Sequence, residues 1–164
     1  MSGDRLQKIV DSLTVRLKRD YLVEKSLSEI QEVLQSDRAV LYHFYRQWQG
    51  QVTCEMLSAI ELSILGSIGA DECFNGEYAA LYEAGRVRAI ADIEVEPIHE
   101  CHRDFLRSMK VRANLAVPIL TAKGLWGLLI AHQCSGPRTW LRSEIEFMEK
   151  QAQNMAMSPT IQDS

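Results

Sequence analysis

The sequence predicts an α+β domain: an antiparallel sheet with the terminal helices on one face and a helical insertion forming a ligand pocket on the other. Three observations support this. Both ends of the chain have amphipathic helical periodicity, two hairpin-like segments of strand composition lie between them, and a long section poor in strand pattern separates the hairpins. Since each sheet face must be covered, helices on both sides of one sheet are the simplest arrangement.

The first elements are a long helix and a hairpin. Over residues 4–35, apolar side chains recur every three or four positions, which is typical of an amphipathic helix. The segment "RAVLYHFY" is rich in β-branched and aromatic residues, as is typical of a strand. The segment "QVTCEML", which follows the turn-like "QWQG", is read as the second strand. Residues 38–57 are therefore expected to form a β-hairpin.

Residues 58–112 predict two short helices, near 76–84 and 100–109, with irregular chain around them. An irregular section of this length commonly carries a functional site. Next, "ANLAVPIL", the turn "TAKG" and "LWGLLIAHQC" predict a second hairpin, whose almost continuous apolar character indicates burial on both faces. The segment "LRSEIEFMEKQAQNMAM" closes the fold as an amphipathic helix. We expect a linker helix over 1–22, the main domain over 23–156 and a frayed tail over 157–164.

Composition excludes several classes of partner. A chain of 164 residues is the size of one domain, and a net charge of −4 with a pI near 5.6 argues against nucleic acid or an anionic membrane as partner. No apolar run of about 18 residues predicts a membrane span, and the N-terminus has no secretory leader pattern, so a cytoplasmic location is expected. In a reducing compartment, cysteines without a CxxC pattern are expected to be thiols.

The four cysteines differ in setting. Cys54 and Cys134 fall in predicted strands, where a thiol usually acts as a small hydrophobe. By contrast, Cys73 in "DECF" follows two carboxylates, and Cys101 in "CH" lies between Glu100 and His102. Such polar settings favour a chemical role for these two thiols over a role in packing. One alternative is a zinc site made by Cys101, His102, His132 and Cys134, although an adjacent Cys-His pair is not the usual ligand spacing.

Five segments carry a family resemblance. "ADECFNGEYAALYEAGRVRAIADIE", "CHRDFL", "VRANLAVPIL", "LWGLLIAHQC" and "PRTW" together resemble the bilin-binding GAF domains of cyanobacteriochromes, photoreceptors related to phytochromes. The resemblance covers about residues 24–156. Its Asp-x-Cys-Phe motif is typical of a subfamily with two bilin-reactive cysteines.

The resemblance implies a linear tetrapyrrole cofactor, phycocyanobilin or its isomer phycoviolobilin. It implies that Cys101 holds the A-ring side chain through a thioether, and that Cys73 forms a second, reversible thioether to the bridge between rings B and C. Asp71 would accept hydrogen bonds from pyrrole N–H groups, and His102 would exchange protons beside Cys101. Further expected contacts are two arginines for the propionates, a histidine near the D ring and three aromatic side chains: Arg86 and Arg88; His132; Phe74, Tyr78 and Phe105.

The implied function is a light sensor, not an enzyme, in which a double bond of the bilin isomerises. Attachment of Cys73 would interrupt the conjugated system and give a blue or violet state, whereas its release would give a green or longer-wavelength state. The alternative is a thiol redox enzyme on the same fold, such as a free methionine sulfoxide reductase, which would leave Asp71 and Arg86 unexplained. An output domain outside this chain is expected, with homodimers formed through the terminal helices. In that pairing four apolar side chains would contact a second chain or the C-terminal helix: Leu6, Ile9, Leu13 and Leu17.

Overall fold

One antiparallel sheet forms the middle layer of the molecule. The structure is a computed structural model that describes residues 2–69 and 76–164. Within these ranges the sheet has five strands in the order β2-β1-β5-β4-β3, and every neighbouring pair is antiparallel. The strands are β1 (Arg38–Arg46), β2 (Gln49–Leu57), β3 (Arg88–Ile90), β4 (Ala113–Thr121) and β5 (Gly124–Gln133).

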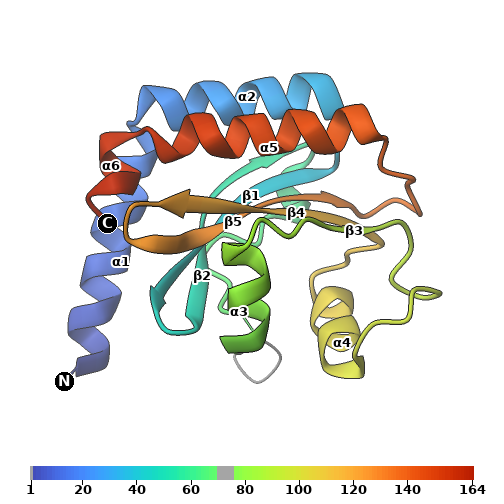
Figure 1. The fold of residues 1–164 in the computed structure, drawn as a ribbon, viewed down its shortest axis with the longest axis horizontal. Helices are drawn as coiled ribbons and strands as arrows, with labels where there is room; N and C mark the ends of the chain where they lie inside the picture. The colour runs from blue at the N-terminus through green and yellow to red at the C-terminus, as the bar shows by residue number, and fades with distance from the viewer. Residues whose placement is uncertain (1, 70–75) are drawn as a thin grey trace.

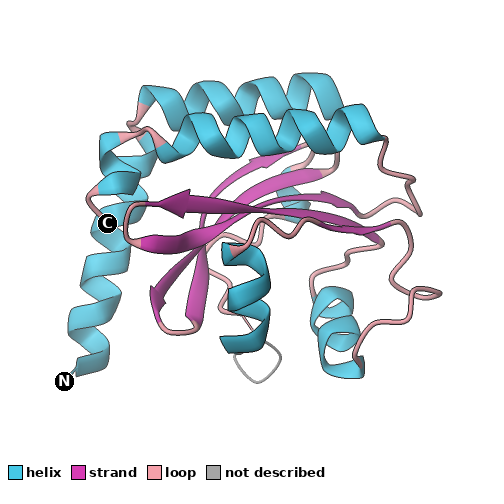
Figure 2. Ribbon diagram, in the orientation of Figure 1, coloured by secondary structure: helices cyan, strands magenta, loops and turns pink. Residues whose placement is uncertain are grey.

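Helices cover both faces of this sheet, which confirms the predicted α+β architecture. The long helices α2 (Tyr21–Leu34) and α5 (Arg142–Ala156) lie side by side across one face, as Figure 1 shows. The short helices α3 (Gly76–Glu83) and α4 (Glu100–Ser108) lie on the other face (Figure 2). A 3-10 turn, η1 (Ile60–Leu62), lies in the connection that follows β2. Both predicted hairpins and both predicted short helices are present.

The main core lies between the sheet and the two long helices. Strand residues such as Leu115 and Leu129 pack there against Ile30 of α2 and Met148 of α5, and all four side chains are fully buried. Because side chains alternate along a strand, Asn114 and Ala116 of β4 point to the opposite face, toward α3 and α4. This burial on both faces explains the almost continuous apolar pattern of β4 and β5.

The predicted continuous helix over 4–35 is wrong, because the chain breaks it at Arg19–Asp20. Asp20 caps α2: its carboxylate accepts hydrogen bonds from the backbone N–H groups of Leu22 and Val23, at 3.0 and 3.2 Å. An aspartate satisfies otherwise unpaired N–H groups at a helix start, so it favours a new helix over a continued one.

Helix α1 (Ser2–Lys18) packs on its own chain. It contacts β2 and the C-terminal helix α6 (Pro159–Gln162), and Leu13 and Leu17 are buried in the main core with 3% and 0% exposure. Of the side chains expected to face a second chain, Ile9 is exposed. The expectation that Leu13 and Leu17 would face a second chain is therefore corrected to contacts within the chain, which include the C-terminal helix.

The C-terminal tail is packed, in contrast to the expected fraying. Ser158 caps α6 by accepting a hydrogen bond from the N–H of Ile161, and Ile161 is fully buried. The Ser158 hydroxyl also donates to the Asp20 carboxylate, which joins α6 to the start of α2. In the part of the chain that the structure describes, no helix is long and apolar enough to cross a membrane.

Candidate functional site

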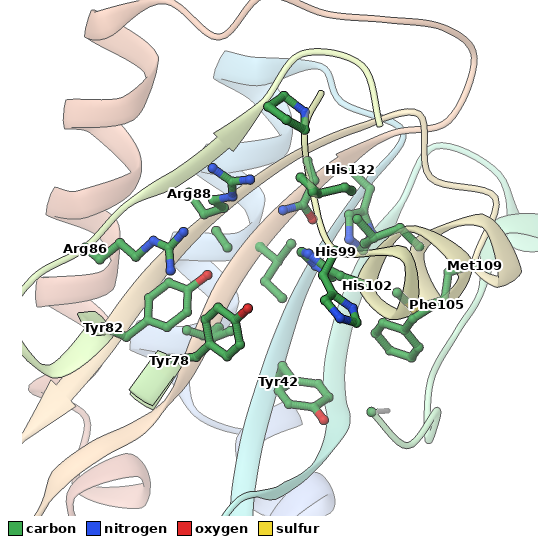
Figure 3. Close-up of a pocket in the computed structure, with 18 residues that line it drawn as sticks. Tyr42, Tyr78, Tyr82, Arg86, Arg88, His99, His102, Phe105, Met109 and His132 are labelled. Atoms are coloured by element: carbon green, nitrogen blue, oxygen red, sulfur yellow. The ribbon is translucent and has the colours of Figure 1, made fainter. Parts of the chain in front are cut away.

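A cavity of about 420 Å³ lies between the sheet and helices α3 and α4. This volume is within the range of about 300–1,000 Å³ that is typical of small-molecule sites. Figure 3 shows Arg86, Arg88, Tyr78 and Tyr82 on one side of the cavity and His102, Phe105 and Met109 on the other. The cavity therefore joins a cationic and aromatic wall to a histidine-bearing helix.

Most of the predicted site residues line this cavity. They are Tyr78 of α3, Arg86 and Arg88 at β3, His102 and Phe105 of α4, and His132 of β5. Cys101 precedes His102 in the first turn of α4 and is half-buried. The remaining predictions, Asp71, Cys73 and Phe74, lie outside the residues that the structure describes.

Cys101 lies at the N-terminus of α4. The cap residue is His99, whose Nδ1 accepts a hydrogen bond from the backbone N–H of Cys101 at 3.1 Å. Unpaired N–H groups and the helix dipole make a helix start locally positive. The position is therefore suited to a nucleophilic cysteine.

Arginine side chains hold α4 against the loop before it. Arg103 donates from Nε to the carbonyl of Ile93 at 2.8 Å and from Nη2 to the carbonyl of Glu96 at 2.7 Å. One turn later, Arg107 forms an ion pair with Glu94 at 2.6 Å. These links hold the loop over 91–99 and the helix together, so the helix start stays in a defined place beside the cavity.

Arg86 and Arg88 offer positive charge to a ligand. Arg88 is the first residue of β3 and Arg86 precedes the strand, and both are half-buried. The Arg86 guanidinium lies 5.7 Å from the ring centre of Tyr82 and 6.0 Å from that of Tyr78, within the range of a cation–π contact. Neither arginine forms an ion pair with a described carboxylate. Both guanidinium groups can therefore bind carboxylates of a ligand.

His102 is neutral in this setting. Burial, followed by the charges of Arg88 and Arg86, lowers the pKa of His102 to about 4. A neutral imidazole has one nitrogen that accepts a proton and one that donates. The imidazole next to Cys101 is therefore uncharged at neutral pH and can accept a hydrogen bond at one ring nitrogen while it donates one at the other.

His132 is the most buried polar group of the cavity. It is 1% exposed, and burial followed by the charge of Arg38 holds its pKa well below the ordinary value. Its Nδ1 lies 3.0 Å from Nε of Arg38, whereas Nε2 has no hydrogen-bond partner among the described residues. Asn114 is the cross-strand partner of His132, is 4% exposed and lines the same cavity.

Sequence reasoning missed Arg38, Asn114 and Tyr42 as site residues. Arg38 and Asn114 are polar positions within almost continuously apolar strands, and this departure from the pattern was the available signal. Tyr42 lies in the cavity wall because two glycines give it room. A Cβ atom at Gly50 would lie 2.3 Å from the Tyr42 ring, and one at Gly69 would lie 1.6 Å from its hydroxyl oxygen.

The other two cysteines do not reach the cavity. Cys54 is buried in the main core, and burial raises its pKa to about 12, so it is an inert packing residue as predicted. Cys134 follows the end of β5, and burial raises its pKa as well. Within residues 2–69 and 76–164, no three His, Cys, Asp or Glu side chains are placed to hold a metal ion. The alternative of a zinc site at Cys101 and Cys134 is therefore wrong.

The chain is similar to known proteins of one domain family over most of its length. The family model for the GAF domain matches residues 19–158. An uncharacterized protein of Picosynechococcus sp. is 48% identical over 151 residues, which cover 92% of this chain and 93% of the relative. The circadian input-output histidine kinase CikA of Synechocystis sp. is 31% identical and matches 93% of this chain, but the chain spans only 24% of that kinase.

Solved structures have the same architecture. The GAF domain of the cyanobacteriochrome receptor PixJ from Thermosynechococcus elongatus, in its blue-light absorbing form, is 34% identical and has a TM-score of 0.79; the match covers 88% of this chain and 85% of that one. A GAF domain with bound phycoerythrobilin, at 23% identity and a TM-score of 0.75, shares the fold.

Proposed function

The chain belongs to the GAF domain family, and from this premise we propose that it is a light sensor that binds a linear tetrapyrrole in the cavity beneath α3 and α4. The observation that carries the proposal is the placement of three complementary groups around one cavity. Arg86 and Arg88 suit the two propionates, a buried His132 suits a ring carbonyl, and the lining residue His102 directly follows Cys101 in the first turn of α4. The likeness to PixJ over 88% of the chain supports the same proposal.

A bound bilin would supply an electrophilic side chain and a conjugated system in which light isomerises the double bond between rings C and D. The chain's own residues would bind and orient it. Cys101 would hold the pigment through a thioether as its S–H adds across the electrophilic double bond, with the thiol proton ending on the adduct carbon, and the neutral His102 would offer a hydrogen-bonding imidazole beside that bond. Tyr78 and Phe105, which line the cavity, would flank the ring system.

We also propose the two-cysteine photocycle, for which the "DECF" segment is the support. In this photocycle Cys73 would supply a second, reversible thioether to the bridge between rings B and C, and Asp71 and Phe74 would contact the pigment. Bonded, the shortened conjugated system absorbs blue or violet light; released, it absorbs green or longer wavelengths. Phycocyanobilin and its isomer phycoviolobilin are the pigments proposed. The signal would pass to an output domain of a longer protein, an arrangement consistent with the size of the kinase relative.

Coexpression with the enzymes that make phycocyanobilin tests the proposal. We expect a coloured protein that changes its absorption spectrum on illumination and whose denatured band fluoresces with zinc. Cys134→Ala is the matched control, because this half-buried thiol lies outside the cavity, and it should keep both properties. A colourless protein would contradict the light-sensor proposal, and reduction of free methionine sulfoxide by that protein would support the thiol enzyme instead.

A further inference from the structure

We propose that Arg38 is a positioning residue that holds His132 in its Nε2–H tautomer and so makes this part of the cavity a committed hydrogen-bond donor to a ligand carbonyl oxygen. The identity of the ligand rests on the proposed function, but the state of His132 does not. The two residues are cross-strand partners on β1 and β5, 94 positions apart in the sequence.

The tautomer follows from the chemistry of the contact. Nε of Arg38 lies 3.0 Å from Nδ1 of His132, and both residues are 1% exposed. A guanidinium group has only donors, so Nδ1 must accept. A neutral imidazole carries one proton, which is then on Nε2. The other tautomer would place two N–H donors against each other without water to separate them, and a charged ring would place a second cation beside Arg38.

Arg38 cannot easily turn away from this contact. Its Nη1 donates to the carbonyl of Leu62 in η1, and its Nη2 donates to the carbonyl of Met109 after α4, each at 2.6 Å. Three hydrogen bonds in fixed directions hold a planar group in one orientation. The guanidinium thus holds three separate segments in place, and one of these is the end of the helix that carries Cys101 and His102.

The consequence is selectivity in the cavity. His132 lines the cavity, and its Nε2 has no hydrogen-bond partner in the part of the chain that the structure describes. With the proton held on Nε2, the ring can donate but cannot accept at that atom. A ligand group with a carbonyl oxygen is favoured there, and one that presents only N–H is disfavoured. The neighbouring Asn114 amide can serve either kind of group, so it does not discriminate in this way.

Nitrogen NMR of the histidine rings in the protein without pigment tests the tautomer. His132→Gln identifies the signals of His132. We expect a single Nε2–H tautomer in the wild type and loss of this single state, with a mixed population, in Arg38→Met. Arg103→Met is the matched control: it also removes guanidinium bonds to two backbone carbonyls beside α4, but the Arg103 guanidinium bonds Ile93, Glu96 and Glu100 and not His132, so the His132 signals should stay as in the wild type.

Either of two results would overturn the inference: an Nδ1–H or charged His132 in the wild type, or an unchanged single tautomer in Arg38→Met. The wild-type measurement decides the matter even where Arg38→Met does not fold. In the pigment-loaded protein, the absorption maximum of the attached bilin should shift in the same direction in Arg38→Met and His132→Gln. Opposite shifts would also count against the inference. Failure of the wild type to bind bilin would refute the proposed function and leave the NMR result standing.

Discussion

Acidification should destabilise the pigment-free protein, in part through a histidine outside the proposed site. His43 of β1 is 7% exposed, its ring centre lies 4.3 Å from that of Trp126, and its Nδ1 donates to the Trp126 carbonyl at 2.9 Å. Burial lowers the pKa of His43 from 6.5 to about 4. A proton placed on this ring must enter a dry site, so the folded state resists protonation.

The sign and size of the effect follow from this pKa. Between the unfolded pKa of 6.5 and the folded pKa of about 4, the unfolded chain binds a proton that the folded chain does not. The free energy of unfolding is therefore highest above the unfolded value and falls as the pH drops through this window. At about pH 5 the loss from His43 alone is about 2 kcal/mol, because one unit of pKa difference corresponds to about 1.4 kcal/mol.

Urea unfolding of the wild type and of His43→Phe, each at about pH 8 and about pH 5, measures this contribution. Phenylalanine keeps a ring beside Trp126 but does not titrate. His102 and His132 also have lowered pKa values, so both proteins should lose stability in acid. The wild type should lose about 2 kcal/mol more than the variant. Equal losses in the two proteins would show that His43 is not held neutral by burial, and would refute the reasoning.

Three further predictions concern the site and the packing. Cys101→Ala should fold but lose the zinc-fluorescent band, whereas Cys73→Ala should keep that band and lose the blue-absorbing state; a normal band in the first variant, or blue switching in the second, would reassign the thiols. Gly127→Ala should lower the free energy of unfolding by about 1–3 kcal/mol, because its Cβ would lie 2.1 Å from the backbone oxygen of Tyr42; Gly136→Ala, with open space around the Cβ, is the control, and equal stability of the two would contradict the packing. Removal of residues 1–20 should cost on the order of 5 kcal/mol, since it uncovers the buried side of α1; sedimentation of both forms in both light states tests the homodimer, which stays a prediction.

Much of the fold followed from local patterns. The almost continuous apolar character of "ANLAVPIL" and "LWGLLIAHQC" predicted β4 and β5, because an apolar strand without a polar face is expected within a sheet that is covered on both sides. The helical periodicity of the ends predicted α2 and α5 in the same way. The cap at Asp20 was overlooked because the apolar period runs on through it, although an aspartate before an apolar run is a known start signal.

The candidate site was also predictable only in part from the sequence. The sequence by itself determined which residues could carry chemistry: a cysteine before a histidine, two alternating arginines and a histidine in an apolar strand each stood out in their local setting. Only the tertiary structure decided that Arg38 contacts His132, that Asn114 lies beside His132 and that Leu13 packs in the core of its own chain. Strand register and helix packing set these contacts between distant segments, and register depends on the fit of whole elements, which no local period of side chains records.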